Sequence, residues 1–467
     1  MSIYSRFQEL AENGRDIAGI SARDVYRKMI NEGAVIAGLG VANLPLLDLL
    51  PAIGVRRLSV RDRALPDAAT QARLAALGCH TAFSEGYLDA PMRGIVFRTP
   101  SLRPDHPALT EARRAGAVVL TEAALLLALT PADIFAVTGS DGKTTTAMMC
   151  AAILAATGRR TYLGGNIGTP LLSRICEMRA TDALVVELSS FQLMDTAPPR
   201  GRCAITNITE NHLDWHRDMA EYTAAKAAIL GGGVGVLGAG CPSSLGRGDT
   251  VTVGHGDPFG ACAVFDERGT VYARRGGVIT PLFSTDVLPL PGRHNTENAM
   301  TAAALTMDAA SPAAMAEALS RFRGAPHRLT YVGCFHGVRC YDASIDTTPA
   351  RTVTSLAALD GKPTVILGGR DKNLSYDALG RALVARARAA VLVGESADKL
   401  AETIARADTD GGFPTVRARD LAEAVAAAFA LTEAGGTILL SPAATSFDMF
   451  KNYSERGDLF AALCRSQ

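Results

Sequence analysis

Three stretches of the chain alternate short apolar runs with longer Ala- and Leu-rich segments of helical character. This alternation is typical of parallel α/β sheets, in which a buried strand is followed by a helix that covers it. The first stretch has an apolar run at 34–40 that enters a glycine turn, a helical segment at 44–50 and a strand ending near Val60. It resembles the start of a dinucleotide fold, although the third glycine of the fingerprint falls on Asn43.

The second stretch places an apolar strand at 134–138, a glycine-containing loop and a helix at 143–156. The third stretch follows Arg328, and its strands are expected at 364–367, 390–393 and 437–440. Two of these strands run into polar loops at 368–372 and 441–446. Because ligands bind at the carboxyl ends of strands in open α/β sheets, both loops are candidate walls of a site.

Turn signals at 130–133 and 324–326 divide the chain into three parts. We therefore expect an α/β protein with a Rossmann-like N-terminal domain, a central α/β domain that contains the glycine loop after 134–138, and a C-terminal Rossmann-like domain. The expected boundaries are 1–130, 131–327 and 328–467.

Composition narrows the function. The chain has 47 basic and 47 acidic residues, so no global field favours nucleic acid or an anionic membrane. Acidic residues precede any apolar run near the N-terminus, and no uncharged apolar run reaches 18 residues. We expect a cytoplasmic protein that binds neither nucleic acid nor membrane. Nine scattered cysteines without metal or disulfide spacing are expected to be mostly buried thiols.

Residues 139–145 carry the clearest chemistry. A strand that turns through glycines into a helix aims backbone N–H groups and the positive helix end at one point, which suits phosphate oxygens. A lysine then adds charge for the β and γ phosphates, and a threonine hydroxyl can ligate Mg²⁺. The first glycine of a full Walker A motif is replaced by Val137. We predict ATP hydrolysis, with phosphate-loop residues Gly139, Ser140, Asp141, Gly142, Lys143, Thr144 and Thr145.

Four other residues are candidates for the functional site, and each also has a simpler structural explanation. Glu187 ends an apolar strand and is either a Mg²⁺ ligand or an edge charge. His212 lies in a polar cluster near the chain's one Trp, and is either a ligand or a structural histidine. Lys226 is a solvated helix residue, or a metal ligand if CO₂ carbamylates it. Asp62, about twenty residues after the first glycine turn, either accepts hydrogen bonds from a ribose or base or is a solvated strand-end carboxylate.

Together these motifs resemble the Mur ligases of peptidoglycan synthesis. The resemblance runs through the whole chain in order, and it is carried by residues 138–145, 164–170, 187–190, 211–214, 292–299, 326–328 and 446–453. The last run, Ser-Phe-Asp-Met-Phe-Lys-Asn-Tyr, is typical of the members that add D-glutamate. The family's three-domain build then implies a UDP-binding first domain, a central ATPase and a third domain that supplies the amino acid.

The resemblance also implies roles for individual residues. The substrates would be UDP-N-acetylmuramoyl-L-alanine, D-glutamate and ATP, with two Mg²⁺ ions, and we expect a monomer. Asn166, Ser189 and His212 would face the UDP-sugar, and Asp62 and Arg63 its uracil. Thr144, Glu187, His212 and carbamylated Lys226 would hold the metal ions. Asn295, Asn298 and Arg328 would bind nucleotide, and Thr347, Lys372, Ser446 and Tyr453 would bind D-glutamate.

One segment departs from the family pattern. Around 341–349 many members have an Asp-Ser-Lys-Ala-Thr-Asn-like run, and Ile345 stands here where a lysine would. The resemblance would place a nucleotide contact at Asp342 or Asp346, and the pattern favours neither. Three alternatives stay open: another Mur or folylpolyglutamate-type ligase, a nucleotide-dependent switch, and a non-catalytic scaffold. The C-terminal run argues against the first, the lack of an Asn-Lys-x-Asp run against the second, and the full set of candidate metal-site residues against the third.

Overall fold

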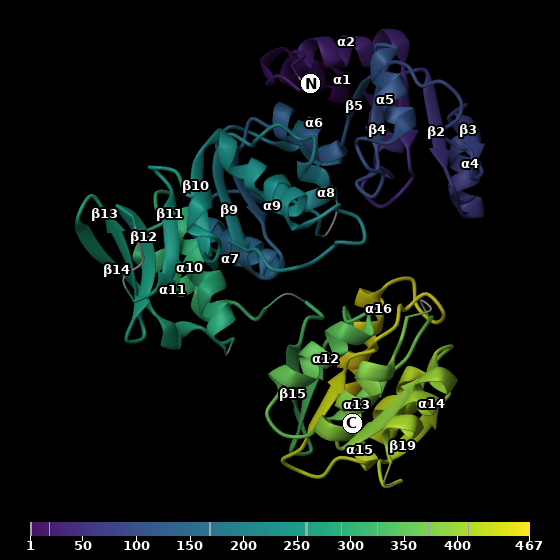
Figure 1. Cartoon of the computed structure of the whole chain (residues 1–467), viewed down its shortest axis with the longest axis vertical. Helices are drawn as coiled ribbons and strands as arrows, with labels where there is room; N and C mark the ends of the chain where they lie inside the picture. Colours follow the sequence, from purple (N-terminus) through teal and green to yellow (C-terminus); the bar gives the residue numbers. More distant parts are fainter. Residues whose placement is uncertain are drawn as a thin grey trace. The chain divides into compact units, whose positions relative to one another are not determined.

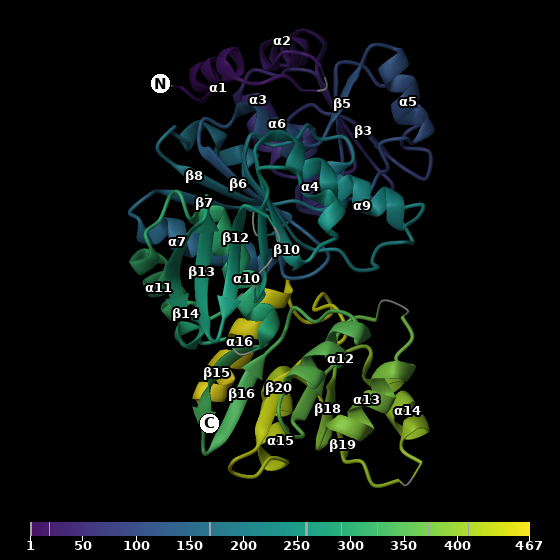
Figure 2. The ribbon, with the colours of Figure 1, turned by 60° about the vertical axis from the view of Figure 1, so that its left-hand side comes forward.

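The computed structural model describes residues 2–17, 19–167, 170–256, 260–290, 292–324, 326–371, 374–409 and 411–467. Lys372 lies outside these ranges, as do Gly168 and Thr169 of the 164–170 motif. The chain forms two compact units, Met1–Phe322 and Arg323–Gln467, each described by itself (Figures 1 and 2). Across the described residues, no helix combines the length and the apolarity that a bilayer span needs.

The first sheet of the larger unit is parallel, in the order β3-β2-β1-β4-β5. Its central strand, β1, is buried at every position, as expected of a strand covered on both faces. The strands are β1 (Ala34–Ala37), β2 (Leu58–Asp62), β3 (His80–Phe83), β4 (Ile95–Arg98) and β5 (Val118–Leu120). The helices are α1 (Ile3–Asn13), α2 (Ala22–Glu32), α3 (Leu46–Ala52), α4 (Ala68–Ala76), α5 (Pro107–Arg114) and α6 (Glu122–Leu129).

The second sheet has the order β14-β13-β12-β11-β10-β9-β6-β8-β7, parallel except for β12–β13 and β13–β14. Its strands are β6 (Asp133–Thr138), β7 (Thr161–Gly165), β8 (Ala183–Glu187), β9 (Gly201–Asn207), β10 (Val234–Gly240), β11 (Val251–His255), β12 (Cys262–Glu267), β13 (Thr270–Arg275) and β14 (Val278–Ser284). Its helices are α7 (Lys143–Ala156), α8 (Ser190–Leu193), α9 (Met219–Ala227), α10 (Arg293–Thr306) and α11 (Pro312–Arg321). Short 3₁₀ turns are η1 (Leu172–Glu177), η2 (Ala228–Gly232), η3 (Ser243–Leu245) and η4 (Thr285–Val287).

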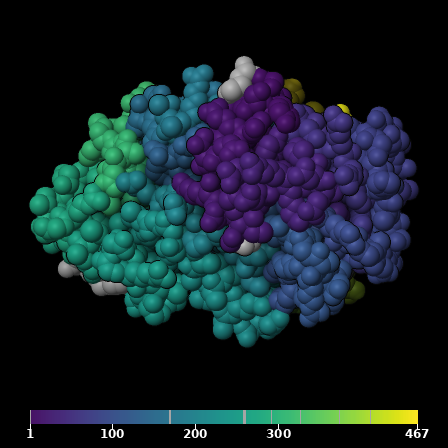
Figure 3. All heavy atoms as spheres, turned by 90° about the horizontal axis from the view of Figure 1, so that it is seen from above, coloured from purple at the N-terminus to yellow at the C-terminus, as the bar shows by residue number. Residues whose placement is uncertain are grey.

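Strand β6 shows how the two sheets share a core. Phe135 and Val137 pack in one apolar cluster with α7, α10 and α11, whereas Ile134 and Ala136 belong to a cluster that also contains α1, α2 and α6. Figure 3 shows the atoms of the N-terminal segment, in purple, beside the blue and teal atoms of later segments. The Arg6 guanidinium donates to the Met178 carbonyl at 3.0 Å. These contacts explain why both sheets lie in one compact unit.

The smaller unit has a six-stranded sheet within its described residues, in the order β15-β16-β20-β17-β18-β19. Among the described strands, β15–β16 is the one antiparallel pair. The strands are β15 (Thr330–Phe335), β16 (Val338–Asp342), β17 (Thr364–Leu367), β18 (Ala389–Val393), β19 (Thr415–Ala418) and β20 (Thr437–Leu440). Its helices are α12 (Pro349–Ala358), α13 (Asp377–Arg386), α14 (Ala397–Ala407), α15 (Leu421–Ala430) and α16 (Tyr453–Arg465). One face packs on α12, α13 and α14, and the other on α15 and α16.

The prediction of an α/β fold with largely parallel sheets is confirmed. The helix at 143–156 and the strands at 364–367 and 437–440 have the predicted limits. The boundaries near 130 and 327 stay predictions. All nine cysteines carry free thiols, but only four are buried, so the expectation of mostly buried thiols is wrong.

Candidate active site

Two glycines shape the turn between β6 and α7. Gly139 has a φ of 148° and Gly142 a φ of 75°, a region that favours glycine. A Cβ atom on Gly139 would collide with the hydroxyl of Thr206, and one on Gly142 with the side-chain oxygen of Asn298. The turn therefore needs glycine at both positions, because its backbone lies close to β9 and α10.

The loop is also tied to the end of β9. The Ser140 N–H donates to the Asn207 carbonyl at 3.0 Å, and the Asp141 N–H donates to the Asn207 side-chain oxygen at 2.8 Å. The Thr206 hydroxyl donates to the Asp141 carbonyl at 2.5 Å, and the Ser140 hydroxyl to the Thr209 carbonyl at 2.9 Å. These bonds pre-organise the loop at the N-terminus of α7, where a phosphate is favoured by the helix dipole.

Lys143 and Thr144 begin helix α7. The Lys143 ammonium donates to the Ser140 carbonyl at 2.9 Å, so its charge lies over its own loop. The Thr144 hydroxyl donates to Glu187 Oε2 at 2.8 Å, while Thr145 is buried. The register that pairs Val137 with Glu187 brings this carboxylate to the same sheet edge as the loop.

Asn166 reaches the same carboxylate from the end of β7. Its side-chain amide donates to Glu187 Oε1 at 3.0 Å, and its backbone N–H donates to the Glu187 carbonyl at 2.8 Å. Glu187 is 1% exposed, so the alternative interpretation of this residue as an edge charge is wrong. The structure thus brings together three of the predicted residues, Thr144, Asn166 and Glu187.

Lys226 is buried beneath the loop. It is 2% exposed, its Nζ donates to the Gly139 carbonyl at 2.6 Å and lies 4.6 Å from the centre of the Tyr222 ring. Burial, with the nearby charge of Lys143, lowers the pKa of Lys226 to about 7. The interpretation of Lys226 as a solvated helix residue is therefore wrong, because α9 turns this side chain into the protein.

His212 lies at the surface, near the charges of Lys143 and Lys226. Its backbone has a φ of 56°, which is unusual for a residue with a side chain, and its ring packs 5.0 Å from the ring of Phe191. Partial burial and the charges of Lys143 and Lys226 lower the pKa of His212. The neutral imidazole that results is the form able to bind a metal or accept a hydrogen bond.

The donor set fits Mg²⁺ in part. Among the described residues, no three His, Cys, Asp or Glu side chains gather into a metal-binding group. Mg²⁺ prefers carboxylate and hydroxyl oxygens, and the oxygens of Thr144 and Glu187 lie 2.8 Å apart. Lys226 fits only as an oxygen-bearing carbamate, because an ammonium would repel the ion.

Three other candidates border this region. Asn298 is 7% exposed on α10, and its side-chain oxygen accepts from the Thr146 hydroxyl at 3.2 Å. Asn295 lies one turn earlier on α10, at the start of the helix. Ser189 caps α8, since its hydroxyl accepts from the Gln192 N–H at 3.2 Å.

The first-sheet candidates lie at the end of β2. Asp62 Oδ2 accepts from the Leu39 N–H at 2.6 Å and Oδ1 from the Ala64 N–H at 3.1 Å. Asp62 thus fixes the glycine turn after β1 and is only half-exposed. Arg63 is exposed and pairs with Glu85 at 2.7 Å.

In the smaller unit, the two candidates for the nucleotide contact, Asp342 and Asp346, have different partners. Asp342 Oδ2 lies 2.7 Å from His327 Nδ1, beside Arg328, and this carboxylate raises the pKa of His327. Asp346 accepts from the hydroxyls of Ser355 at 2.6 Å and Ser441 at 2.8 Å, so its side chain is engaged within the unit.

The D-glutamate candidates of this unit are spread over several segments. Thr347 follows β16 and is half-buried, and Ser446 is 2% exposed after β20. Tyr453 begins α16 and is 37% exposed. Lys372 falls outside the described residues.

Comparisons with known proteins identify the family. The model of the Mur ligase middle domain matches residues 137–306, and that of the Mur ligase glutamate ligase domain matches 327–444. A UDP-N-acetylmuramoylalanine–D-glutamate ligase of Ruminiclostridium cellulolyticum is 36% identical, over 93% of this chain and 96% of its own. The ligase of that name from Symbiobacterium thermophilum is 38% identical, over 93% and 98%. The chain belongs to the Mur ligases.

It is an ATP-dependent ligase of peptidoglycan synthesis, so the scaffold and switch alternatives fall away. A solved UDP-N-acetylmuramate–alanine ligase from Thermotoga maritima matches with a TM-score of 0.56 at 20% identity, covering 93% of this chain and 99% of the other. That likeness shows the shared fold alone.

Several residues that organise this ligase carry little signal in the sequence. The phosphate loop is held or covered by Asn207, Thr206 and Tyr222. Tyr222 lies one turn before Lys226 on α9, and this spacing places the two side chains on one face of the helix. Arg456 of α16 is 2% exposed and donates to the carbonyls of Ser344, Gly368 and Ala444, which joins the ends of three strands. An arginine in a C-terminal amphipathic helix carries no sequence signal of burial.

Proposed function

We propose that this ligase joins D-glutamate to UDP-N-acetylmuramoyl-L-alanine, releasing ADP and phosphate. The observation that carries the proposal is the convergence of Thr144, Asn166, Glu187 and Lys226 around one phosphate loop. The printed names of the relatives supply the substrates.

The chemistry requires an activated carboxylate. Oxide is a very poor leaving group, so a carboxylate does not react with an amine directly. The muramoyl-alanine carboxylate attacks the γ-phosphorus of ATP, which forms an acyl phosphate and releases ADP. The D-glutamate amine then attacks the carbonyl carbon, loses a proton and expels phosphate. Lys143, held over the loop, offsets negative charge on the transferring group.

We assign two Mg²⁺ ions to Thr144, Glu187, His212 and carbamylated Lys226. Bound there, Mg²⁺ would neutralise phosphate charge. The remaining assignments are those implied by the family. Asn166 and Ser189 face the UDP-sugar, Asp62 and Arg63 its uracil, and Asn295, Asn298 and Arg328 the ATP; Thr347, Lys372, Ser446 and Tyr453 hold D-glutamate. We further propose a cytoplasmic monomer.

The surroundings of Lys226 support carbamylation. CO₂ reacts with a neutral amine, forming an N–C bond and releasing a proton, and a pKa of about 7 keeps much of this amine neutral in the cell. The product is an anion that suits the position under the loop. Lys226→Ala is expected to lose activity that formate or acetate partly restores. Full activity of the alanine variant would remove the carbamate from the mechanism.

Phosphate release tests the substrate assignment. Purified protein with Mg²⁺ and ATP is expected to release phosphate only when UDP-N-acetylmuramoyl-L-alanine and D-glutamate are both present. Equal release with L-lysine, diaminopimelate or a folate would overturn the amino-acid assignment. Mass spectrometry of the product should show the mass of the added glutamate.

A further inference from the structure

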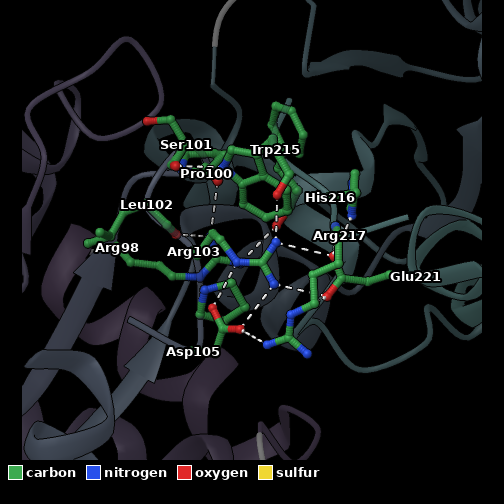
Figure 4. A network of polar contacts seen from close by, with 12 residues as sticks. Arg98, Pro100, Ser101, Leu102, Arg103, Asp105, Trp215, His216, Arg217 and Glu221 are labelled. Carbon is green, nitrogen blue, oxygen red and sulfur yellow. Dashed lines mark hydrogen bonds and ion pairs between the residues drawn. The ribbon is translucent and has the colours of Figure 1, made fainter. Parts of the chain in front are cut away.

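The loop that follows β4 lies against the segment that leads from His212 to α9 (Figure 4). Arg103 is the centre of this contact, and its side chain is 23% exposed. Its guanidinium also stacks on Trp215, with the central carbon 4.9 Å from the ring centre. Both segments belong to the larger unit, although they are more than a hundred residues apart in the chain.

Every N–H donor of the Arg103 guanidinium has an acceptor. Nε and Nη2 donate to the Asp105 carboxylate at 2.9 and 3.0 Å. Nη2 and Nη1 donate to the two oxygens of Glu221 at 2.9 and 3.2 Å, and Nη1 also donates to the Trp215 carbonyl at 2.6 Å. A lysine has one point charge and cannot reproduce this planar fork. The geometry is therefore specific to arginine.

The Trp215 contacts extend this network to His212. The indole N–H of Trp215 donates to the Ser101 carbonyl at 2.8 Å, and its backbone N–H donates to the His212 carbonyl at 3.1 Å. Phe191 packs 4.2 Å from the Trp215 ring and 5.0 Å from the His212 ring. Because His212 has a left-handed backbone, its conformation depends on such surrounding contacts.

The Glu221 contacts extend the network to Lys226. Glu221 lies in the first turn of α9, and Lys226 in the last. Glu221 also accepts from the Arg217 N–H at 2.9 Å, and Oε2 lies 3.3 Å from Nδ1 of His216, whose other ring nitrogen lies 2.9 Å from the Ser190 hydroxyl. Fixing Glu221 thus fixes the start of the helix that carries the buried lysine under the phosphate loop.

We propose that Arg103 is a positioning residue of the ligase, which acts through Trp215 and Glu221 to hold His212 and Lys226 in their places. The inference rests on the roles proposed above for those two residues. Arg103 itself lies in the loop after the first-domain strand β4, so this loop becomes part of the machinery that aligns the phosphate-transfer site.

The chain offers a direct probe of this network, because Trp215 is its one tryptophan. In Arg103→Met, the emission of Trp215 should shift and its quenching by acrylamide should rise. The kcat of phosphate release should fall at least tenfold, while KM for ATP changes less than threefold and Tm stays within a few degrees of the parent. The kcat of Arg103→Lys should lie between those of Arg103→Met and the parent. The lysine keeps the charge, but the planar fork of donors is lost.

Two controls separate positioning from general stability. Arg114→Met removes an exposed arginine of α5 that pairs with Glu111 at 3.5 Å, and it should leave emission and kcat unchanged. Glu221→Gln removes the partner charge, and the double variant with Arg103→Met should be no slower than the slower single variant. Additive losses would contradict action through Glu221.

The outcomes also separate this inference from the proposed function. Absence of D-glutamate-dependent phosphate release in the parent would overturn the function itself. A parent that is active, with an Arg103→Met variant of changed Trp215 emission and unchanged kcat, would overturn the positioning role alone. If Arg103→Met fails to fold, Arg103→Lys decides, and a parental kcat in that variant would count against the proposal.

Discussion

At the residue scale, the Thr144 hydroxyl has one observed contact and one proposed role. It donates to a carboxylate that is 1% exposed, and it is the oxygen that the Mg²⁺ assignment needs. Thr144→Val keeps the shape and removes the oxygen. We expect phosphate release to fall by about 100-fold, since the hydroxyl serves metal and phosphate alignment in phosphate loops. Initial rates across a Mg²⁺ titration would measure this.

Thr144→Ser is the matched control, because it retains the hydroxyl and loses only a methyl group. Its rate should stay within about tenfold of the parent. The valine variant should also lose about 1–3 kcal/mol of stability, because one oxygen of Glu187 loses a partner in a buried place. A valine variant as fast as the serine variant would show that the hydroxyl has no role in turnover.

Residues differ in how far the sequence could predict them. The loop at 139–145 was predictable because glycines, lysine and threonine act through local backbone geometry. Lys226 was not, because a lysine on a short helix has the same pattern whether the helix turns it outward or inward. Its burial depends on the loop after β6, where the Gly139 carbonyl accepts from it, 87 residues earlier in the chain.

At the element scale, buried strands and the phosphate-loop helix were predictable from apolar runs. The antiparallel strands β12, β13 and β14 were not predicted, nor was the pairing of β15 with β16. Outer strands such as β14 are exposed at several positions, so no continuous apolar run identifies them. Sheet order also depends on long-range pairing, which a local pattern does not contain.

Helix α6 begins with a carboxylate in an apolar place. Glu122 is 4% exposed, accepts from the Leu172 N–H at 2.8 Å, and burial raises its pKa to about 7. The folded state therefore binds more protons than the unfolded state above the ordinary pKa of 4.5. The contribution of Glu122 to stability is fully present below that value and is lost as the pH rises through about 7.

Glu122→Gln removes this titration and keeps an acceptor for Leu172. The stability of the variant relative to the parent should rise between pH 5 and pH 8, by up to about 3 kcal/mol. Thermal melting followed by Trp215 emission at both pH values reports on the same compact unit. Glu111→Gln, at an exposed position of α5, should show no such change. A pH-independent difference for Glu122→Gln would refute the buried charge.

At the scale of the whole molecule, the candidate residues are found in both compact units. The phosphate loop and the proposed metal-site residues lie in Met1–Phe322, and the described D-glutamate candidates lie in Arg323–Gln467. Among the described residues, each apolar core cluster stays within one unit. Local sequence patterns can identify the candidate residues within each unit.

Expression of the larger unit alone tests whether ATP binding and amino-acid binding belong to different units. Residues 1–322 should fold and still bind a non-hydrolysable ATP analogue, because the loop and its supports are complete there. The Kd should be higher than that of the full chain, because the fragment lacks Arg328, which we assign to ATP. This fragment should release no D-glutamate-dependent phosphate, since the proposed amine-holding residues lie in the other unit. Calorimetry and the phosphate assay measure the two properties. Full turnover by residues 1–322 alone would mean that the smaller unit does not hold the amino acid.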